Sequence, residues 1–266
     1  MLSSSLSLNT VPDPTPKPTD LKVQIHTAAL NHRDFFQRQH LYPGTTFSVP
    51  LLADGCGVVT DVGSSASSSW KGKRVILTPG WGWESLVEGP DRPTKYSILG
   101  GTKFNPVGTA QDVACVPEHE VEEAPEHLSD AEAAALPLCG LTAWRAFMVK
   151  SGNAEAGRNI LVTGIGGGVA LNVLQFAVAK GCNVYVTSGS EKKIAKAKEL
   201  GAKGGAIYKK ADWEKDLLQQ LPKDRPEFDA IIDGAGGEIV GKGVKLLKVS
   251  VLDIAGAYRS ISIDYY

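Results

Sequence analysis

The feature that most limits the fold of this chain is a glycine-rich turn between an apolar segment and a helix-like segment. Residues 159–163, Asn-Ile-Leu-Val-Thr, form an apolar run, and residues 164–168 read Gly-Ile-Gly-Gly-Gly. Helical spacing follows over residues 169–180, and a second apolar run occupies residues 183–187. Strands that are buried on both faces read as near-continuous apolar runs, which are typical of a parallel sheet. The pattern therefore predicts a β-α-β unit.

This turn has the composition of a pyrophosphate-binding site. Glycine lets the backbone approach phosphates closely, and the amide groups and dipole of a helix N-terminus favour negative charge. A glycine run alone also suits a tight structural turn, but its position inside a β-α-β unit favours dinucleotide binding. The residues predicted to bind the dinucleotide here are Gly164, Gly166, Gly167, Gly168 and Val169.

The end of the second strand indicates which dinucleotide is bound. An NAD site usually has Asp or Glu at this point, which bonds the ribose 2′-hydroxyl. Here the chain has Ser188 instead, and Lys192 and Lys193 follow shortly after it. Small hydroxyls and a nearby ammonium would hold a 2′-phosphate, which a carboxylate would repel. We predict NADP(H) as the cofactor; the alternative is that both lysines are simply solvated helix residues.

The rest of the chain divides into two parts with different patterning. Residues 20 to about 120 indicate a small β-rich domain, because short strands alternate there with stretches of Gly, Pro and Ser. Ser129 and Glu132 form a capping box that predicts a helix start. After residue 157 strands and helices alternate, which predicts an α/β doubly wound parallel sheet. Beyond the β-α-β unit, strands are expected at 21–26, 58–62, 74–78 and 228–233, and helices at 142–148, 191–200 and 239–248.

Composition excludes several classes of protein. A length of 266 residues predicts about two domains, and a formal net charge of −1 offers no basic excess for binding nucleic acid. The apolar runs are far shorter than the ~20 residues that cross a bilayer, so no membrane partner is expected. Four cysteines do not form a disulfide framework, and the N-terminus does not resemble a targeting signal. We therefore expect a cytoplasmic protein.

Several blocks of the sequence resemble the medium-chain dehydrogenase/reductase superfamily, in particular its zinc-independent quinone oxidoreductase and enoyl reductase branch. The resemblance covers about residues 10–248. The blocks that carry it are residues 31–34 (Asn-His-Arg-Asp), 42–44 (Tyr-Pro-Gly), 53–59, 136–144, 163–170, 196–202 and 207–209.

This resemblance implies a GroES-like domain at residues 1–125 and a Rossmann NADP-binding domain at residues 126–266, with the active site in the cleft between them. It also implies that Lys193 and Tyr208 flank the 2′-phosphate, and that Thr142 lies near the nicotinamide. The glycine fingerprint differs slightly from the family pattern, because its last position is occupied by alanine.

The resemblance also allows a test for zinc. Zinc alcohol dehydrogenases of this superfamily have Cys where this chain has Asn31, a His in the block around Asp54, and a Cys that survives here as Cys139. A catalytic zinc needs about three protein ligands, and the four cysteines are too widely spaced for a structural zinc lobe. We expect no metal and interpret Cys139 as a small buried residue.

Without zinc, the expected chemistry is hydride delivery from NADPH to an electrophilic carbon of an enone, a quinone or a related small-molecule carbonyl substrate. Negative charge then develops on the carbonyl oxygen and requires hydrogen-bond donors. Asn31 and Tyr42 are the candidate catalytic residues; the alternative is that Asn31 serves a local turn and Tyr42 packs on a loop. The pair His119-Glu120 begins like a metalloprotease helix, but Glu123 occupies the position of the second histidine.

Both ends of the sequence differ from the family pattern. Relatives continue after residue 248 with a strand and further elements, whereas here residues 251–254 are expected at most to form one strand before the chain ends. We therefore expect a truncated product with an unfinished sheet edge, and a homodimer if that edge is intact. Two alternative functions are a zinc-dependent alcohol dehydrogenase and a non-catalytic remnant that binds a nucleotide.

Overall fold

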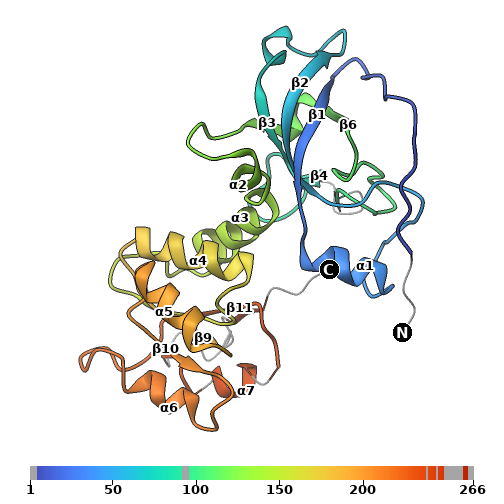
Figure 1. Cartoon of the computed structure of the whole chain (residues 1–266). Helices are drawn as coiled ribbons and strands as arrows, with labels where there is room; N and C mark the ends of the chain where they lie inside the picture. The colour runs from blue at the N-terminus through green and yellow to red at the C-terminus, as the bar shows by residue number, and fades with distance from the viewer. Residues whose placement is uncertain (1–4, 92–95, 238, 244, 249–259, 263–266) are drawn as a thin grey trace. The chain divides into compact units, whose positions relative to one another are not determined.

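The computed structural model of the chain describes residues 5–91, 96–237, 239–243, 245–248 and 260–262. They form two compact units, of which the first ends at Leu138 and the second begins at Cys139 (Figure 1). Each unit has its own sheet and its own hydrophobic core, as separate domains do. No helix among the described residues is long and apolar enough to cross a membrane.

The first unit is built on an antiparallel sheet with the strand order β6-β1-β2-β3-β7. Alternate residues of a strand point to the same side, so Leu21 and Val23 of β1 enter the core together with Val59 of β2. Gly57 is required where β1 and β2 approach, because a Cβ there would lie 2.1 Å from the Gln24 carbonyl oxygen. The strands are β1 (Asp20–Ala29), β2 (Asp54–Val62), β3 (Arg74–Leu77), β6 (Val113–Pro117) and β7 (Val121–Glu123).

Short elements connect these strands. The predicted capping box is confirmed at the start of α2, where Ser129 Oγ accepts from the Glu132 N–H and the Glu132 carboxylate accepts from the Ser129 N–H. A helix at His32–Arg38 was not predicted, because it is only two turns long. The short elements are α1 (His32–Arg38), η1 (Ser68–Trp70), β4 (Gly80–Trp81), β5 (Ser97–Ile98), η2 (Glu118–Glu120) and α2 (Asp130–Ala134).

The second unit is a parallel sheet with the order β10-β9-β8-β11-β12 and helices on both faces. Ile160 and Val162 of β8 pack on one face, in a core with α4, whereas Leu161 between them packs on the other face with α6. The prediction of a GroES-like domain followed by a Rossmann sheet is therefore confirmed. The strands are β8 (Asn159–Val162), β9 (Asn183–Ser188), β10 (Gly204–Ile207), β11 (Ala230–Asp233) and β12 (Ser260–Ser262); the helices are α3 (Pro137–Trp144, which starts in the first unit), η3 (Arg145–Lys150), α4 (Gly168–Ala179), α5 (Glu191–Glu199), α6 (Trp213–Leu218) and α7 (Ile239–Gly243).

Two predicted helices differ from the observed ones. The helix predicted at 142–148 begins earlier, at Pro137, and continues from Arg145 as the π-helical segment η3. Proline suits a helix start because its missing N–H would have no partner there. The helix predicted at 239–248 ends at Gly243. The following backbone pairs with Phe228 instead, which donates to the Leu246 carbonyl at 2.9 Å.

The second unit also contains strands and a helix that the sequence pattern did not predict. Strand β10 begins with two glycines and so lacks an apolar pattern, and α6 is shorter than two full turns. Strand β12 pairs in parallel with β11 at the edge of the sheet. The strand predicted at 251–254 lies outside the described residues, and the homodimer through this edge stays a prediction.

Candidate functional site

The glycine-rich turn connects β8 to α4 in the second unit. Gly164 and Gly166 have positive φ angles of 61° and 117°, a region that side chains disfavour. Gly167 is the N-cap residue of α4, and no side chain of the described residues caps this helix end. The N–H groups of the first helical turn point out of the helix and can bind an anion. The turn therefore combines positive-φ glycines with an uncapped helix start, and its role in binding a pyrophosphate stays a prediction.

The strands on both sides of β8 hold this turn in place. The Ile165 N–H donates to the Thr187 carbonyl at 2.8 Å, and the Gly164 N–H donates to Thr187 Oγ1 at 3.2 Å. On the other side, the Thr163 hydroxyl donates to the carboxylate of Asp233. The carboxyl ends of β9, β8 and β11 thus meet at the turn, which is where doubly wound sheets bind dinucleotides.

Asp233 is a residue that the sequence analysis missed. Its buried carboxylate also accepts from the Gly236 N–H at 3.0 Å and from the Ala235 N–H at 3.3 Å, so it shapes the loop after β11. The available signal was its position as the last residue of a predicted apolar strand. Polar residues at strand ends of a parallel sheet meet at one edge, which makes them candidates for a site.

The glycines of the turn differ in the space around them. A Cβ on Gly168 would lie 2.6 Å from Cys139 Sγ, so α4 starts in close contact with α3. A Cβ on Gly166 would lie 3.0 Å from Lys193 Nζ. A Cβ on Gly167, in contrast, would approach only one backbone oxygen, at 3.8 Å. The backbone is therefore open to a ligand at Gly167 and covered by the Lys193 side chain at Gly166.

The residues predicted to hold a 2′-phosphate lie at the ends of β9 and β10. Ser188 ends β9, and its hydroxyl accepts from the Ser190 N–H at 3.2 Å. Tyr208 follows β10, and its N–H donates to the Ser188 carbonyl at 3.1 Å. A Cβ on Gly189 would lie 2.9 Å from the Tyr208 hydroxyl, so this hydroxyl lies over Gly189. The structure therefore brings Ser188 and Tyr208 together at one edge of the sheet.

The other predicted cofactor residues lie on three different helices. Lys192 and Lys193 are both exposed in the first turn of α5, and the Lys193 side chain reaches over Gly166 of the glycine-rich turn. The Val169 side chain packs against the core of the second unit, so a ligand at the turn could contact the backbone N–H of Val169 and not its side chain. Thr142 is partly buried on α3.

In the first unit, Asn31 belongs to a buried polar network at the start of α1. Its Nδ2 donates to the Asp54 carboxylate at 2.8 Å, and its N–H donates to the Asp34 carboxylate at 2.7 Å. The Leu138 N–H donates to the other Asp54 oxygen at 2.9 Å. Burial raises the pKa of Asp54 to about 6, although the hydrogen bonds from Asn31 and Leu138 act in the opposite direction. Asn31 thus has a structural contact, and its catalytic role stays a prediction.

Tyr42 lies in the loop after α1. The Arg33 guanidinium lies over its ring, 4.8 Å from the ring centroid, and its carbonyl accepts from the Thr45 hydroxyl at 2.7 Å. Arg33 also donates to the carbonyls of Leu99 and Gly100 at 2.8 and 3.0 Å. Tyr42 therefore packs on a cation that anchors a neighbouring loop, and its catalytic role also stays a prediction.

Comparison with known proteins identifies the family. Residues 17–126 match the model of the alcohol dehydrogenase GroES-like domain, and residues 168–250 match that of the zinc-binding dehydrogenase family. Over 249 residues the chain is 54% identical to the zinc-type alcohol dehydrogenase-like protein YogA of Leptosphaeria maculans, covering 91% of this chain and 70% of the relative. The chain belongs to the medium-chain dehydrogenase/reductase superfamily. The predicted family membership is confirmed.

Other members of this superfamily match over most of the chain. The 2-methylene-furan-3-one reductase of Solanum lycopersicum is 32% identical over 250 residues, covering 92% of this chain and 57% of the reductase. The crystal structure of an NAD-dependent alcohol dehydrogenase is similar with a TM-score of 0.81 and 33% identity, covering 90% of this chain and 69% of that one. The chain thus spans between about half and about two thirds of the length of these medium-chain dehydrogenases/reductases, and its relatives are oxidoreductases.

Proposed function

We propose that this chain binds NADP(H) and transfers hydride to an enone, a quinone or a related small-molecule carbonyl compound without a metal. The observation that carries the proposal is the edge formed by the ends of β9 and β10. Ser188 stands there where an NAD site would have a carboxylate, and Tyr208 lies beside it. Lys193 extends from α5 to the adjacent glycine-rich turn, which places a cation at the same edge.

The described residues fit a dinucleotide. The uncapped N-terminus of α4 offers N–H groups and a positive dipole end to the pyrophosphate, and the space at Gly167 allows close approach. The hydroxyls of Ser188 and Tyr208 and the ammonium of Lys193 are the groups proposed to hold the 2′-phosphate. Charge-assisted hydrogen bonds of this kind are about twice as strong as neutral ones.

The donor set does not fit a catalytic zinc. Of the three positions that carry zinc ligands in zinc alcohol dehydrogenases, only Cys139 offers a thiolate, and it packs on Gly168 of α4. Asn31 offers an amide whose nitrogen donates to Asp54. An amide that donates through nitrogen is not a zinc ligand, and one cysteine does not make a site. Hydride transfer is therefore proposed without a Lewis acid.

The chain's own residues would then bind the cofactor and stabilise the developing charge. NADPH, when bound, supplies the hydride. Hydrogen-bond donors are required at the carbonyl oxygen as it becomes negative. We propose Asn31 and Tyr42 for that role, because both are polar and both are held in place. Asp34 and Asp54 fix Asn31 at the start of α1, and Arg33 lies over the ring of Tyr42 in the loop after α1. Donors that are already held in position need little reorganisation when the negative charge develops in the transition state.

Fluorescence titration with NADPH and NADH tests the cofactor assignment. Lys193→Ala should weaken NADPH binding about 10- to 100-fold, since a hydrogen bond to a charged group contributes about 1.5–3 kcal/mol. NADH binding should stay within about twofold, because NADH has no 2′-phosphate. Lys192→Ala is the matched comparison, since Lys192 carries the same charge and is equally exposed on the same helical turn, whereas the contact with Gly166 is made by Lys193.

Equal weakening of both coenzymes by Lys193→Ala would contradict the phosphate assignment. A larger effect from Lys192→Ala than from Lys193→Ala would move the assignment to Lys192. Tight NADPH binding without turnover on a panel of enones, quinones and aldehydes would instead identify a nucleotide-binding chain without catalytic activity.

A further inference from the structure

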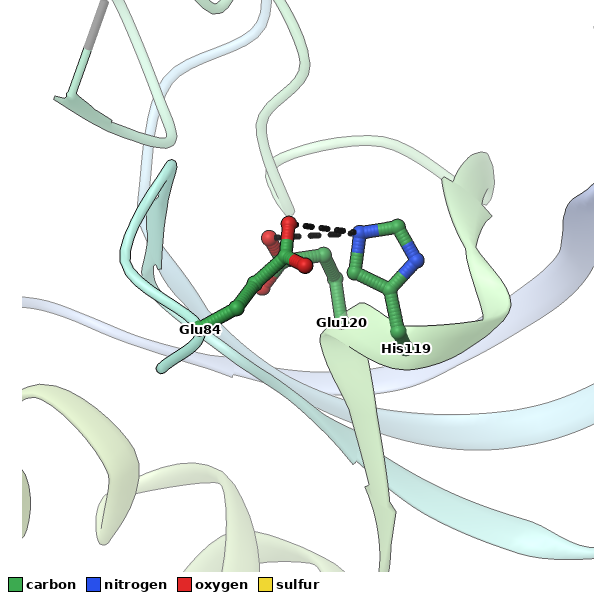
Figure 2. A group of neighbouring side chains, drawn as sticks. All are labelled: Glu84, His119 and Glu120. Atoms are coloured by element: carbon green, nitrogen blue, oxygen red, sulfur yellow. Dashed lines mark ion pairs between the residues drawn. The ribbon is translucent and has the colours of Figure 1, made fainter. Parts of the chain in front are cut away.

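A group of three side chains that could ligate a metal lies in the first unit, apart from the glycine-rich turn. Glu84 lies in the loop after β4, and His119 and Glu120 form most of the short helix η2 (Figure 2). His119 Nε2 is 3.5 Å from Glu84 Oε1 and 3.8 Å from Glu120 Oε1. One potential ligand atom of each residue lies within 4.8 Å of the other two. Figure 2 shows both carboxylates directed toward the same imidazole nitrogen.

The backbone on both sides of this cluster is held in place. The Asp91 carboxylate accepts from the N–H groups of Ser85 and Leu86 at 3.0 and 2.9 Å, and also from the Glu84 N–H. The Glu120 carbonyl accepts from the Thr78 N–H at 2.9 Å, which fixes η2 against the end of β3. The three side chains therefore extend from ordered backbone into a common space.

Glu120 is the residue that points to a ligand. Its side chain is 7% exposed, and its carboxylate accepts no hydrogen bond from the described residues. A buried carboxylate without hydrogen bonds is costly unless a cation is beside it.

Another residue that lines the cavity beside Glu120 has a buried donor without a hydrogen-bond partner in the part of the chain that the structure describes. A cavity of about 350 Å³ is lined by Glu120, His119 and Glu84 together with Trp81 and Ser97. The Trp81 Nε1 is buried and has no hydrogen-bond partner among the described residues. A polar cavity of this size has room for ordered water beside the carboxylate of Glu120.

The ion pair with His119 does not account for the cluster by itself. A protonated imidazole carries one positive charge, whereas Glu84 and Glu120 together carry two negative charges when ionised. A divalent cation neutralises both carboxylates and leaves the imidazole neutral, as a metal ligand must be. Imidazole suits ions such as Zn²⁺, whereas Mg²⁺ and Ca²⁺ prefer oxygen ligands only.

We propose that Glu84, His119 and Glu120 bind one divalent ion of the Zn²⁺ class, with water completing the coordination. The ion would join the loop of residues 84–91 to η2, so its expected role is structural. This inference does not depend on the proposed hydride transfer, and it differs from the zinc ligands of the family, which would include Cys139. Sequence spacing did not show the site, because Glu84 lies 35 residues before His119.

Cobalt titration of the full chain, first treated with a chelator, tests the proposal. Co²⁺ in a site of nitrogen and oxygen ligands should give visible d–d absorption that saturates at one equivalent per chain. Absorption from thiolate-to-cobalt charge transfer should be absent, since no cysteine is a ligand. Zn²⁺ should abolish the signal at stoichiometric amounts, and excess Mg²⁺ should not.

Variants then locate the ion. Glu84→Gln and Glu120→Gln should each weaken Co²⁺ binding at least tenfold. Replacing even a residue that only hydrogen-bonds to a ligand lowers metal affinity about 10- to 100-fold, so replacing a ligand should cost at least as much. Glu84 is 65% exposed, so its replacement leaves the fold intact. Glu122→Gln and His127→Gln are matched controls, since both residues are exposed and outside the cluster, and should bind as the parent chain does.

Three results would overturn the proposal. The first is no Co²⁺ or Zn²⁺ binding to the parent chain. The second is unchanged binding in Glu84→Gln. The third is thiolate charge transfer that disappears in Cys139→Ser, which would place the ion at the family's catalytic zinc position instead.

Discussion

The network around α1 and the glycine-rich turn before α4 each hold a loop in place, but by opposite means. Around α1, charged side chains are removed from water, with Arg33 2% exposed and Asp54 1% exposed. At the turn, most residues are glycines, and hydrogen bonds from the backbone to neighbouring strands fix their positions. Buried charged side chains hold the region around α1, whereas backbone hydrogen bonds of glycine residues hold the turn.

This difference has consequences for substitutions. Removing a buried charged partner leaves other groups unpaired in a site that water does not reach, so it should lower stability. Adding a methyl group to a glycine with free space around it, such as Gly167, should change stability little but obstruct a ligand that binds there. Substitutions around α1 should therefore be measured as loss of stability, and substitutions in the turn as loss of binding.

The largest effect is expected for Arg33→Met. Arg33 pairs with the buried carboxylate of Asp34 at 3.5 Å and donates to two carbonyls after β5. Breaking a buried charge pair costs about 3–5 kcal/mol, because the remaining charge has no partner. Urea unfolding should show this loss, whereas Arg38→Met, at the exposed end of the same helix, should stay within about 0.5 kcal/mol. Equal effects of the two variants would contradict a stabilising network.

The next largest effect concerns Asp54 and pH. Burial raises its pKa in the folded chain to about 6 from an ordinary value of 3.8. The folded state thus binds the proton more tightly, so its contribution to stability is complete below pH 3.8 and is lost as pH rises through 6. This difference corresponds to at most about 3 kcal/mol.

Asp54→Asn removes that titration and keeps polar atoms near Asn31 and Leu138. The free energy of unfolding of the parent chain, relative to Asp54→Asn, should therefore decrease between pH 4 and pH 7. Urea denaturation of both proteins across this range is the measurement. A pH-independent difference would show that Asp54 titrates at its ordinary value.

The smallest stability effect is expected in the turn. Gly166→Ala should lower stability by about 1–3 kcal/mol, because φ is 117° there and a Cβ would press against Lys193. Gly167→Ala should unfold like the parent chain, since its φ is −81° and the space around it is open. Gly167→Ala should nevertheless weaken NADPH binding at least tenfold, because the methyl group would occupy the path of the pyrophosphate. Unchanged NADPH affinity would remove this turn from the binding site.

Much of the second unit could be predicted because its information is local. The apolar runs of β8 and β9 and the glycines between them are contiguous in sequence, and so, in the first unit, is the Ser129–Glu132 capping box. Elements without a local pattern were missed, such as β10 with its two glycines and the short α6. The helix predicted over 239–248 was too long, because pairing of the backbone with Phe228 overrides helical spacing.

The sequence by itself determined the β-α-β unit around the glycine-rich turn, the glycine positions and the family, since periodicity and motif spacing are properties of neighbouring residues. Only the tertiary structure decided which polar groups meet. It brings Asp54 to Asn31 across 23 positions, Asp233 to Thr163 across 70 and Glu84 to His119 across 35. Such contacts depend on how strands pair and loops return, and no local pattern encodes these distances.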